Sequence, residues 1–259
     1  MISRWKSGMA CLWVLMAVVI IFPPLKSAAQ KKQVIPATQT WFGIYEQARF
    51  SNRWGAALDI QLRTKDHFLT GLSQGAIRGS AVYYMNEGLR FSAGYAFFNY
   101  FPGDNHAHIS QPEHRLWQQV QWIDNNRKYR LIHVVRLEER FRRNILNDYT
   151  LAHGNMFNYR ARYQLAAYVP FGHQHFSPGS LTWFISDEIL INFGKEIRTN
   201  YFDQNRFSTG LQYHLTSQKS VQFAYLNVYQ QTSAKRVFRK TDVIRLSFFH
   251  NTDFRKPRN

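Results

Sequence analysis

The chain has 259 residues, of which 45% are hydrophobic and 16% aromatic, and its 33 basic against 16 acidic residues give a formal net charge of +17. The aromatic content excludes a disordered basic tail, because chains without a core are poor in aromatic residues. After residue 29 no apolar run approaches the roughly twenty residues of a membrane-spanning helix, which excludes a helical membrane protein. Abundant aromatic residues in short alternating segments favour a fold made of β-strands.

Residues 1–29 have the three parts of a secretory signal peptide. Arg4 and Lys6 precede an apolar run at residues 11–22, and small residues at 27–29 provide a cleavage site. The apolar run ends at a pair of prolines and is too short for a membrane anchor. We therefore expect an exported protein whose mature chain, residues 30–259, forms one domain.

The mature chain has no thiol, because the only cysteine, Cys11, lies in the signal segment. Disulfides and cysteine metal sites are excluded by this. Removal of the signal also removes three basic residues, so the mature chain keeps 30 basic against 16 acidic residues.

The segment 129–141, YRLIHVVRLEERF, combines an apolar face with a charged face. Successive side chains of a strand point to opposite sides, so residues two apart share a face. One face carries Leu131, His133, Val135 and Leu137, and the other carries Arg130, Ile132, Val134, Arg136, Glu138 and Arg140. A helix would spread these charges over most of its circumference, so the pattern favours a strand.

The same alternation recurs along the chain and predicts eleven strands without a helix. Their expected ranges are 40–50, 54–65, 74–86, 89–101, 113–123, 129–141, 157–169, 181–192, 203–215, 221–230 and 242–254.

The expected connections alternate in length, which is typical of an up-and-down barrel with short turns at one end and long loops at the other. Short connections fall at 51–53, 86–88, 124–128 and 216–220, and longer ones at 66–73, 102–112, 142–156 and 231–241. The long stretch at 170–180 breaks this rhythm. Because bacterial single-chain barrels have even strand numbers, we expect twelve strands, with ten as the alternative. The missing strand would lie near residues 31–40, unless a connection is misassigned.

Two architectures fit such strands. An antiparallel transmembrane β-barrel of the outer membrane turns its apolar faces to lipid and its charges to the lumen, whereas a soluble periplasmic lipocalin-like barrel that binds an apolar ligand does the reverse. The number and regularity of the strands favour the membrane barrel. The residues that would then point outward are Leu58, Ile60, Leu131, Val135, Ile244 and Leu246.

Charged and polar residues on the inner faces of this barrel are the candidate functional residues. They are Glu113, Arg115, Arg136, Glu138, Arg140, Arg160, Arg162, Glu188, Gln204 and Arg206. Opposed residues on neighbouring strands lie about 4.5 to 5.5 Å apart, so these side chains can form ion pairs. In a narrow barrel we favour a structural network, because buried charges must be paired. The alternative is an arginine-lined path for small anionic solutes.

Metal binding and catalysis have weaker support. His106 with His108, and His173 with His175, have a spacing that can chelate a metal, but the sequence fixes no third ligand, so we expect no metal and no cofactor. An outer-membrane lipid hydrolase would need a serine and a histidine in contact on the outer wall.

The only candidates for that contact are Ser186 or Ser247 with His133 or His250, and no nucleophile motif surrounds them. We therefore expect no enzymatic activity.

An exported chain rarely meets nucleic acid, so we do not expect nucleic acid to be the partner of the excess positive charge. Basic residues at 235–240 (KRVFRK) and 255–258 (RKPR) are candidates for contacts with outer-membrane lipid and with the phosphates of lipopolysaccharide.

Six segments in order resemble the Bacteroidetes family catalogued as domain of unknown function 2490. They are 39–55 (QTWFGIYEQARFSNRWG), 113–119 (EHRLWQQ), 136–141 (RLEERF), 157–163 (FNYRARY), 187–192 (DEILIN) and 203–207 (DQNRF). The resemblance covers essentially the whole mature chain. It implies an outer-membrane β-barrel in the cell outer membrane and supplies no activity.

Overall fold

The computed structural model describes residues 32–255 except for 66, 104–105, 127, 173–175, 198–200, 233 and 235. By their contacts the residues divide into two units, Met1–Lys32 and Gln33–Asn259. The predicted signal peptide lies outside the described residues, and the fold below is that of the second unit.

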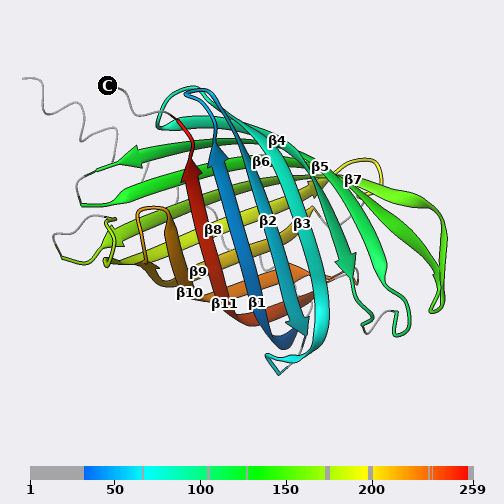
Figure 1. Cartoon of the computed structure of the whole chain (residues 1–259). Helices are drawn as coiled ribbons and strands as arrows, with labels where there is room; N and C mark the ends of the chain where they lie inside the picture. Colours follow the sequence, from blue (N-terminus) through cyan, green and yellow to red (C-terminus); the bar gives the residue numbers. More distant parts are fainter. Residues whose placement is uncertain are drawn as a thin grey trace, which may run out of the picture. The chain divides into compact units, whose positions relative to one another are not determined.

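Eleven strands form the described part of this unit, as the alternation predicts. They are β1 (Gln33–Arg49), β2 (Trp54–Lys65), β3 (Thr70–Tyr84), β4 (Leu89–Tyr100), β5 (Gln111–Asn125), β6 (Arg130–Asn147), β7 (Thr150–Pro170), β8 (Leu181–Phe193), β9 (Phe202–His214), β10 (Lys219–Gln231) and β11 (Val237–Asp253). Consecutive strands pair antiparallel, and the sheet closes into a barrel in which β11 lies beside β1 (Figure 1). Among the described residues no helix is long and apolar enough to cross a membrane.

The expectation of twelve strands, or of ten, is wrong. Residues 33–40 do not form an additional strand; they extend β1, which pairs in parallel with β11 from Gln33↔Val237 to Arg49↔Asp253. An odd number of strands makes the first and the last run in the same direction, so the closing pair has to be parallel. The backbone hydrogen bonds of both edges are satisfied in this way, which removes the exposed edges of an open sheet.

Three of the expected long connections are shorter than expected. The stretch at 142–156 mostly continues β6 and β7, which turn at residues 148–149, while β3 begins at Thr70 and β11 at Val237. The connections therefore do not alternate in length as expected. The β6–β7 ladder reaches the turn through two register shifts, between Arg143 and Ile145 and between Ile145 and Asn147. The rings of Phe141 and Phe157 contact each other, with centres 4.9 Å apart, at the expected strand ends from which this extension continues.

The strands place large apolar side chains outside and polar side chains inside. Leu58 is 42% exposed, Ile60 45% and Val135 44%, and all three point away from the lumen. Their strand neighbours Asp59, Gln61 and Arg136 line the interior. The alternation read from the sequence therefore gives the observed orientation of these strands.

The interior is filled unevenly. Trp41, Leu226, Val228 and Val243 form an apolar cluster on the inner faces of β1, β10 and β11. The ion pairs between neighbouring strands connect the inner faces of β5 to β9. A second apolar cluster, of Ala76, Ala96, Phe98 and Trp117, lies on β3 to β5.

Candidate functional site in the barrel lumen

The lumen contains a cavity of about 1440 Å³ that is lined by residues from all eleven strands. It reaches Arg130 and His214 at the end with the turns 85–88 and 215–218, and Gln111 and Thr232 at the opposite end. Its lining is rich in arginine and glutamine, with few carboxylates. This cavity is the candidate functional site.

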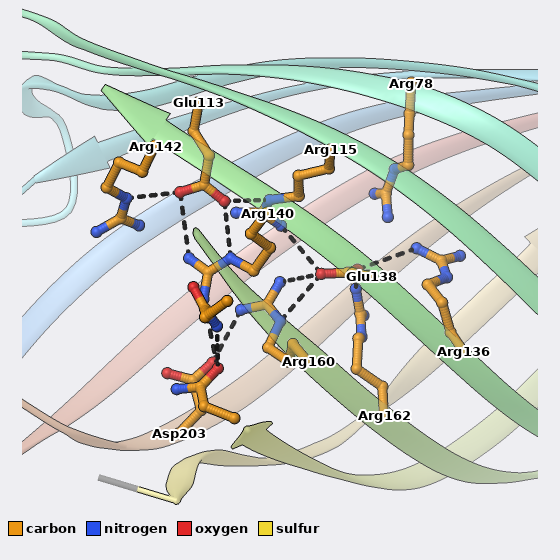
Figure 2. Close-up of polar contacts among 12 residues, drawn as sticks. Arg78, Glu113, Arg115, Arg136, Glu138, Arg140, Arg142, Arg160, Arg162 and Asp203 are labelled. Atoms are coloured by element: carbon orange, nitrogen blue, oxygen red, sulfur yellow. Dashed lines mark hydrogen bonds and ion pairs between the residues drawn. The ribbon is translucent and has the colours of Figure 1, made fainter. Parts of the chain in front are cut away.

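Glu138 of β6 is the most heavily bound carboxylate in the lumen (Figure 2). It is 2% exposed. Arg160 donates to its Oε2 at 2.5 Å and Arg162 to its Oε1 at 2.6 Å. Arg115 is 3.4 Å away and Arg136 3.8 Å. Four arginines from three strands thus surround one charge.

Glu113 of β5 has a comparable environment and is fully buried. Its carboxylate accepts hydrogen bonds from Arg115 at 2.5 Å, from Arg140 at 2.7 Å and from Arg142 at 2.6 Å. Arg115 also reaches Glu138, so the two carboxylates share a guanidinium. Burial of either carboxylate would be costly without these partners.

The ion pairs continue around the barrel to β9. Arg162 bridges Glu138 and Glu188, the latter at 2.6 Å, and Arg206 lies 3.4 Å from Glu188. Arg160 bridges Glu138 and Asp203 at 2.8 Å. The network therefore ties β5, β6, β7, β8 and β9 together across the lumen.

Asp203 joins the network because of a β-bulge. In the β8–β9 ladder Leu190 pairs with Gln204 while Ile191 pairs with Phe202, so Asp203 has no partner residue. An extra residue of this kind re-aims a side chain. Asp203 and Gln204 both face the interior as a result, and strict alternation could not have predicted this for Asp203.

A second set of arginines is held by neutral amides. Arg63 donates to Gln74 at 2.8 Å, Arg90 to Gln47 and Gln121, each at 2.8 Å, Arg136 to Gln119 at 2.6 Å, and Arg245 to Gln222 at 3.0 Å. Among the described residues no carboxylate lies within 4 Å of Arg63, Arg90 or Arg245, and the one near Arg136 is Glu138 at 3.8 Å. We call Arg63, Arg90, Arg136 and Arg245 the amide-held arginines.

The amide-held arginines keep unused hydrogen-bonding capacity. Arg63 Nε, Arg136 Nη1 and Arg245 Nε are buried and have no hydrogen-bond acceptor. Arg63 stacks on Trp41, with its guanidinium carbon 3.7 Å from the ring centre, and Arg136 stacks on Trp117 at 4.4 Å. Stacking on an aromatic face stabilises a guanidinium without neutralising it. The cavity wall therefore carries uncompensated positive charge.

The structure places all ten of the candidate residues named from the sequence on the inner face, and it joins most of them into one ion-pair network. Gln204 lies at the edge of this network, where it accepts a hydrogen bond from Arg206 at 2.9 Å. Sequence reasoning missed several residues of the site. They are Trp41, Arg63, Arg78, Arg90, Trp117, Arg142, Asp203 and Arg245.

Alternation alone could have placed most of the missed residues inside, because they share faces with polar neighbours. It could not have shown which of them lack a carboxylate. Arg142 was missed because it falls in an expected loop.

The histidine pairs named from the sequence do not form a metal site within the described residues. No group of three or more metal-ligating side chains occurs among the described residues, and His173 and His175 lie outside them. His106 contacts the carbonyl oxygen of Ile109, and His108 contacts Asp148 at 2.5 Å. The hydrogen bond with His108 holds the pKa of Asp148 below its ordinary value.

The serine and histidine candidates lie on opposite faces of the sheet. Ser186 and Ser247 are buried on the lumen side. His133 contacts the hydroxyl of Tyr163 at 2.9 Å, and His250 contacts Glu46 at 2.6 Å on the outer face. The structure does not bring the proposed serine–histidine pairs together.

The fold and the lumen define a closed, eleven-stranded, all-β barrel with an arginine–glutamate interior. The chain belongs to the family described as Protein of unknown function (DUF2490), which matches residues 38–239. The family resemblance read from the sequence is thereby confirmed. No curated protein and no solved structure gives a significant match.

The contribution of the ion-pair network to stability can be tested at two neighbouring glutamates, Glu138 and Glu139. The substitution Glu138→Gln removes the charge that balances Arg160 and Arg162, so we expect the free energy of unfolding to fall by about 3–5 kcal/mol. Glu139→Gln is the matched control, because Glu139 points to the opposite face and forms no ion pair within the described residues. It should change the free energy by less than about 0.5 kcal/mol. Urea unfolding in detergent micelles measures both, and equal losses would contradict the role of Glu138.

Proposed function

We propose that the mature protein is an integral outer-membrane β-barrel whose lumen passes small anionic solutes. The observation that carries this proposal is the set of amide-held arginines, which line a cavity that reaches both ends of the barrel. Two separate arguments support it, one from the outer wall and one from the lumen.

The outer wall is suited to lipid. Large apolar side chains are exposed on every strand, among them Ile44, Leu58, Ile77, Leu116 and Ile189. Soluble monomers rarely expose contiguous apolar patches larger than a few hundred square ångströms. This orientation is the one expected of a membrane barrel and the reverse of that expected for the lipocalin-like alternative.

Aromatic side chains lie toward both ends of the outer wall. Trp54 contacts Tyr83 at the end with the turns 85–88 and 215–218, with ring centres 5.0 Å apart. Tyr159 stacks on Phe193 toward the other end, at 5.4 Å. Aromatic girdles of this kind flank the apolar band of outer-membrane barrels because the rings favour the lipid–water interface.

The lumen supports anion passage over a purely structural role. A network that only stabilised the barrel would pair each arginine with a carboxylate, as Glu113 and Glu138 do for their neighbours. The amide-held arginines depart from this pattern, since glutamine fixes the guanidinium but leaves its charge. A ring or ladder of such charges attracts anions and repels cations. Because the glutamine partners are neutral and weakly bound, an anion can bind to these arginines and leave again.

Location is tested by fractionating cells that express the full chain. We expect the mature protein to sediment with the outer membrane, to remain there after an alkaline carbonate wash and to be extracted by detergent. Recovery in the soluble periplasmic fraction without detergent would contradict membrane insertion.

Passage is tested by the reversal potential of the purified protein in planar lipid bilayers under a potassium chloride gradient. We expect chloride to be preferred over potassium, and the double variant Arg63→Gln/Arg136→Gln to lower this preference several-fold, because both residues lose an uncompensated charge. Arg53→Gln is the control, since Arg53 contacts Tyr83 at the turn and does not line the cavity. Cation preference, or no conductance in any form, would contradict passage and leave the network with a structural role.

A further inference from the structure

Three buried N–H groups in the lumen lack an acceptor and lie in one neighbourhood. They are Arg78 Nε, Trp117 Nε1 and Arg136 Nη1. Trp117 is 6% exposed, and the side chain of Arg78 is 10% exposed. Buried donors without partners are rare in native structures, because water has been removed and nothing replaces it. Their occurrence together indicates that an acceptor belongs there.

Packing brings the three donors together. The guanidinium carbon of Arg136 lies 4.4 Å from the ring centre of Trp117. Trp117 in turn packs against Ala76 and Ala96, and Ala96 is the cross-strand partner of Arg78. Figure 2 shows both arginines directed into the same part of the lumen beside Glu138.

The barrel wall next to these donors is free of large side chains. Ala57, Ser80 and Ser92 line the cavity on β2, β3 and β4. Gly94 continues this thin wall, and it pairs with Ser80 on one side and Trp117 on the other. A Cβ at Gly94 would lie 2.1 Å from the carbonyl oxygen of Gly79, so the position accepts only glycine without a backbone shift. The wall beside the donors therefore consists of small side chains and closely packed backbone.

The donor set fits an anion with several oxygen atoms. Three N–H groups on separate side chains can reach different oxygens of one tetrahedral ion, and guanidinium groups match phosphate geometry. Asp59 balances the charge of Arg78 at 2.8 Å, whereas Glu138 is shared by Arg160, Arg162 and, at 3.8 Å, Arg136. The charge of Arg136 is therefore only partly balanced and remains for a ligand.

We propose that Arg78, Trp117 and Arg136 form a binding site for a small phosphate-bearing anion in the lumen. The proposal rests on the proposed function in one respect, since a cavity that admits small anions gives the ligand access to the site. Inorganic phosphate is its simplest ligand, and a phosphate monoester offers the same terminal oxygens.

The site is tested by isothermal titration calorimetry on the mature protein in detergent micelles at low ionic strength. The ligands are inorganic phosphate, glycerol phosphate and, as the control anion, chloride. We expect one phosphate per barrel with a Kd in the millimolar range or below, and weaker binding of chloride. Binding of glycerol phosphate as well would extend the ligand class to monoesters, whereas binding of inorganic phosphate alone would restrict it to the free ion.

Two conservative variants remove single donors. Trp117→Phe keeps an aromatic face for Arg136 but removes the N–H, and Arg136→Gln removes a charge whose hydrogen-bond partner is Gln119. We expect Trp117→Phe to raise the phosphate Kd about fivefold and Arg136→Gln about tenfold or more. Arg53→Gln is the control, because Arg53 contacts Tyr83 at the turn and does not line the cavity. Heat-dependent mobility on gels verifies that each variant is folded.

Absence of phosphate binding, equal binding of chloride, or unchanged affinity in both variants would overturn the site. These outcomes are separate from those for passage. Phosphate binding without conductance would refute passage and keep the site, whereas anion-selective conductance without phosphate binding would keep passage and refute the site.

Discussion

The interior of this barrel depends on the pairing of two buried carboxylates, Glu113 and Glu138, with arginines from neighbouring strands. A charge removed from water is tolerated only with partners of opposite sign, and here three and four guanidiniums surround the two carboxylates. Because the partners come from β5, β6 and β7, and the chain of pairs continues to β9, the network fixes the register and spacing of half of the wall. An apolar cluster around Trp41 packs between β1, β10 and β11.

The lumen contains two kinds of arginine, which have separate roles. Arginines that are paired with carboxylates hold neighbouring strands together, and the carboxylates largely neutralise their charge. Those held by glutamine are positioned just as firmly, because a side-chain amide accepts the same hydrogen bonds, yet their charge is left for a solute. The proposed passage of anions depends on this second kind, and the proposed phosphate site shares Arg136 with it.

The sequence predicted the strands and their faces well where charge and apolar residues alternate without interruption. Arg136, Glu138 and Arg140 on β6, and Arg160 and Arg162 on β7, were placed on one inner surface by spacing alone. The predicted number of strands was wrong because an even number was assumed from bacterial barrels in general. The parallel pairing of β1 with β11 is a tertiary contact that no local pattern encodes. Asp203 could not be placed because a bulge changes its face, and Arg142 because its strand continues past the expected loop boundary. Whether a carboxylate lies near Arg63 depends on which side chains are close in three dimensions, and the periodicity of the sequence does not show this.

The central claim is that lipid meets the leucine and isoleucine side of the strands while the guanidiniums face an aqueous lumen. Residues 33–259 contain no cysteine, so single cysteines carrying a nitroxide can be placed at Ile60 or Leu246 outside and at Gln61 or Gln222 inside. In protein reconstituted into lipid vesicles, electron paramagnetic resonance measures collisions of each label with oxygen, which concentrates in lipid, and with a water-soluble nickel reagent. The account predicts high oxygen accessibility at Ile60 and Leu246 and high nickel accessibility at Gln61 and Gln222. The reverse pattern would contradict it.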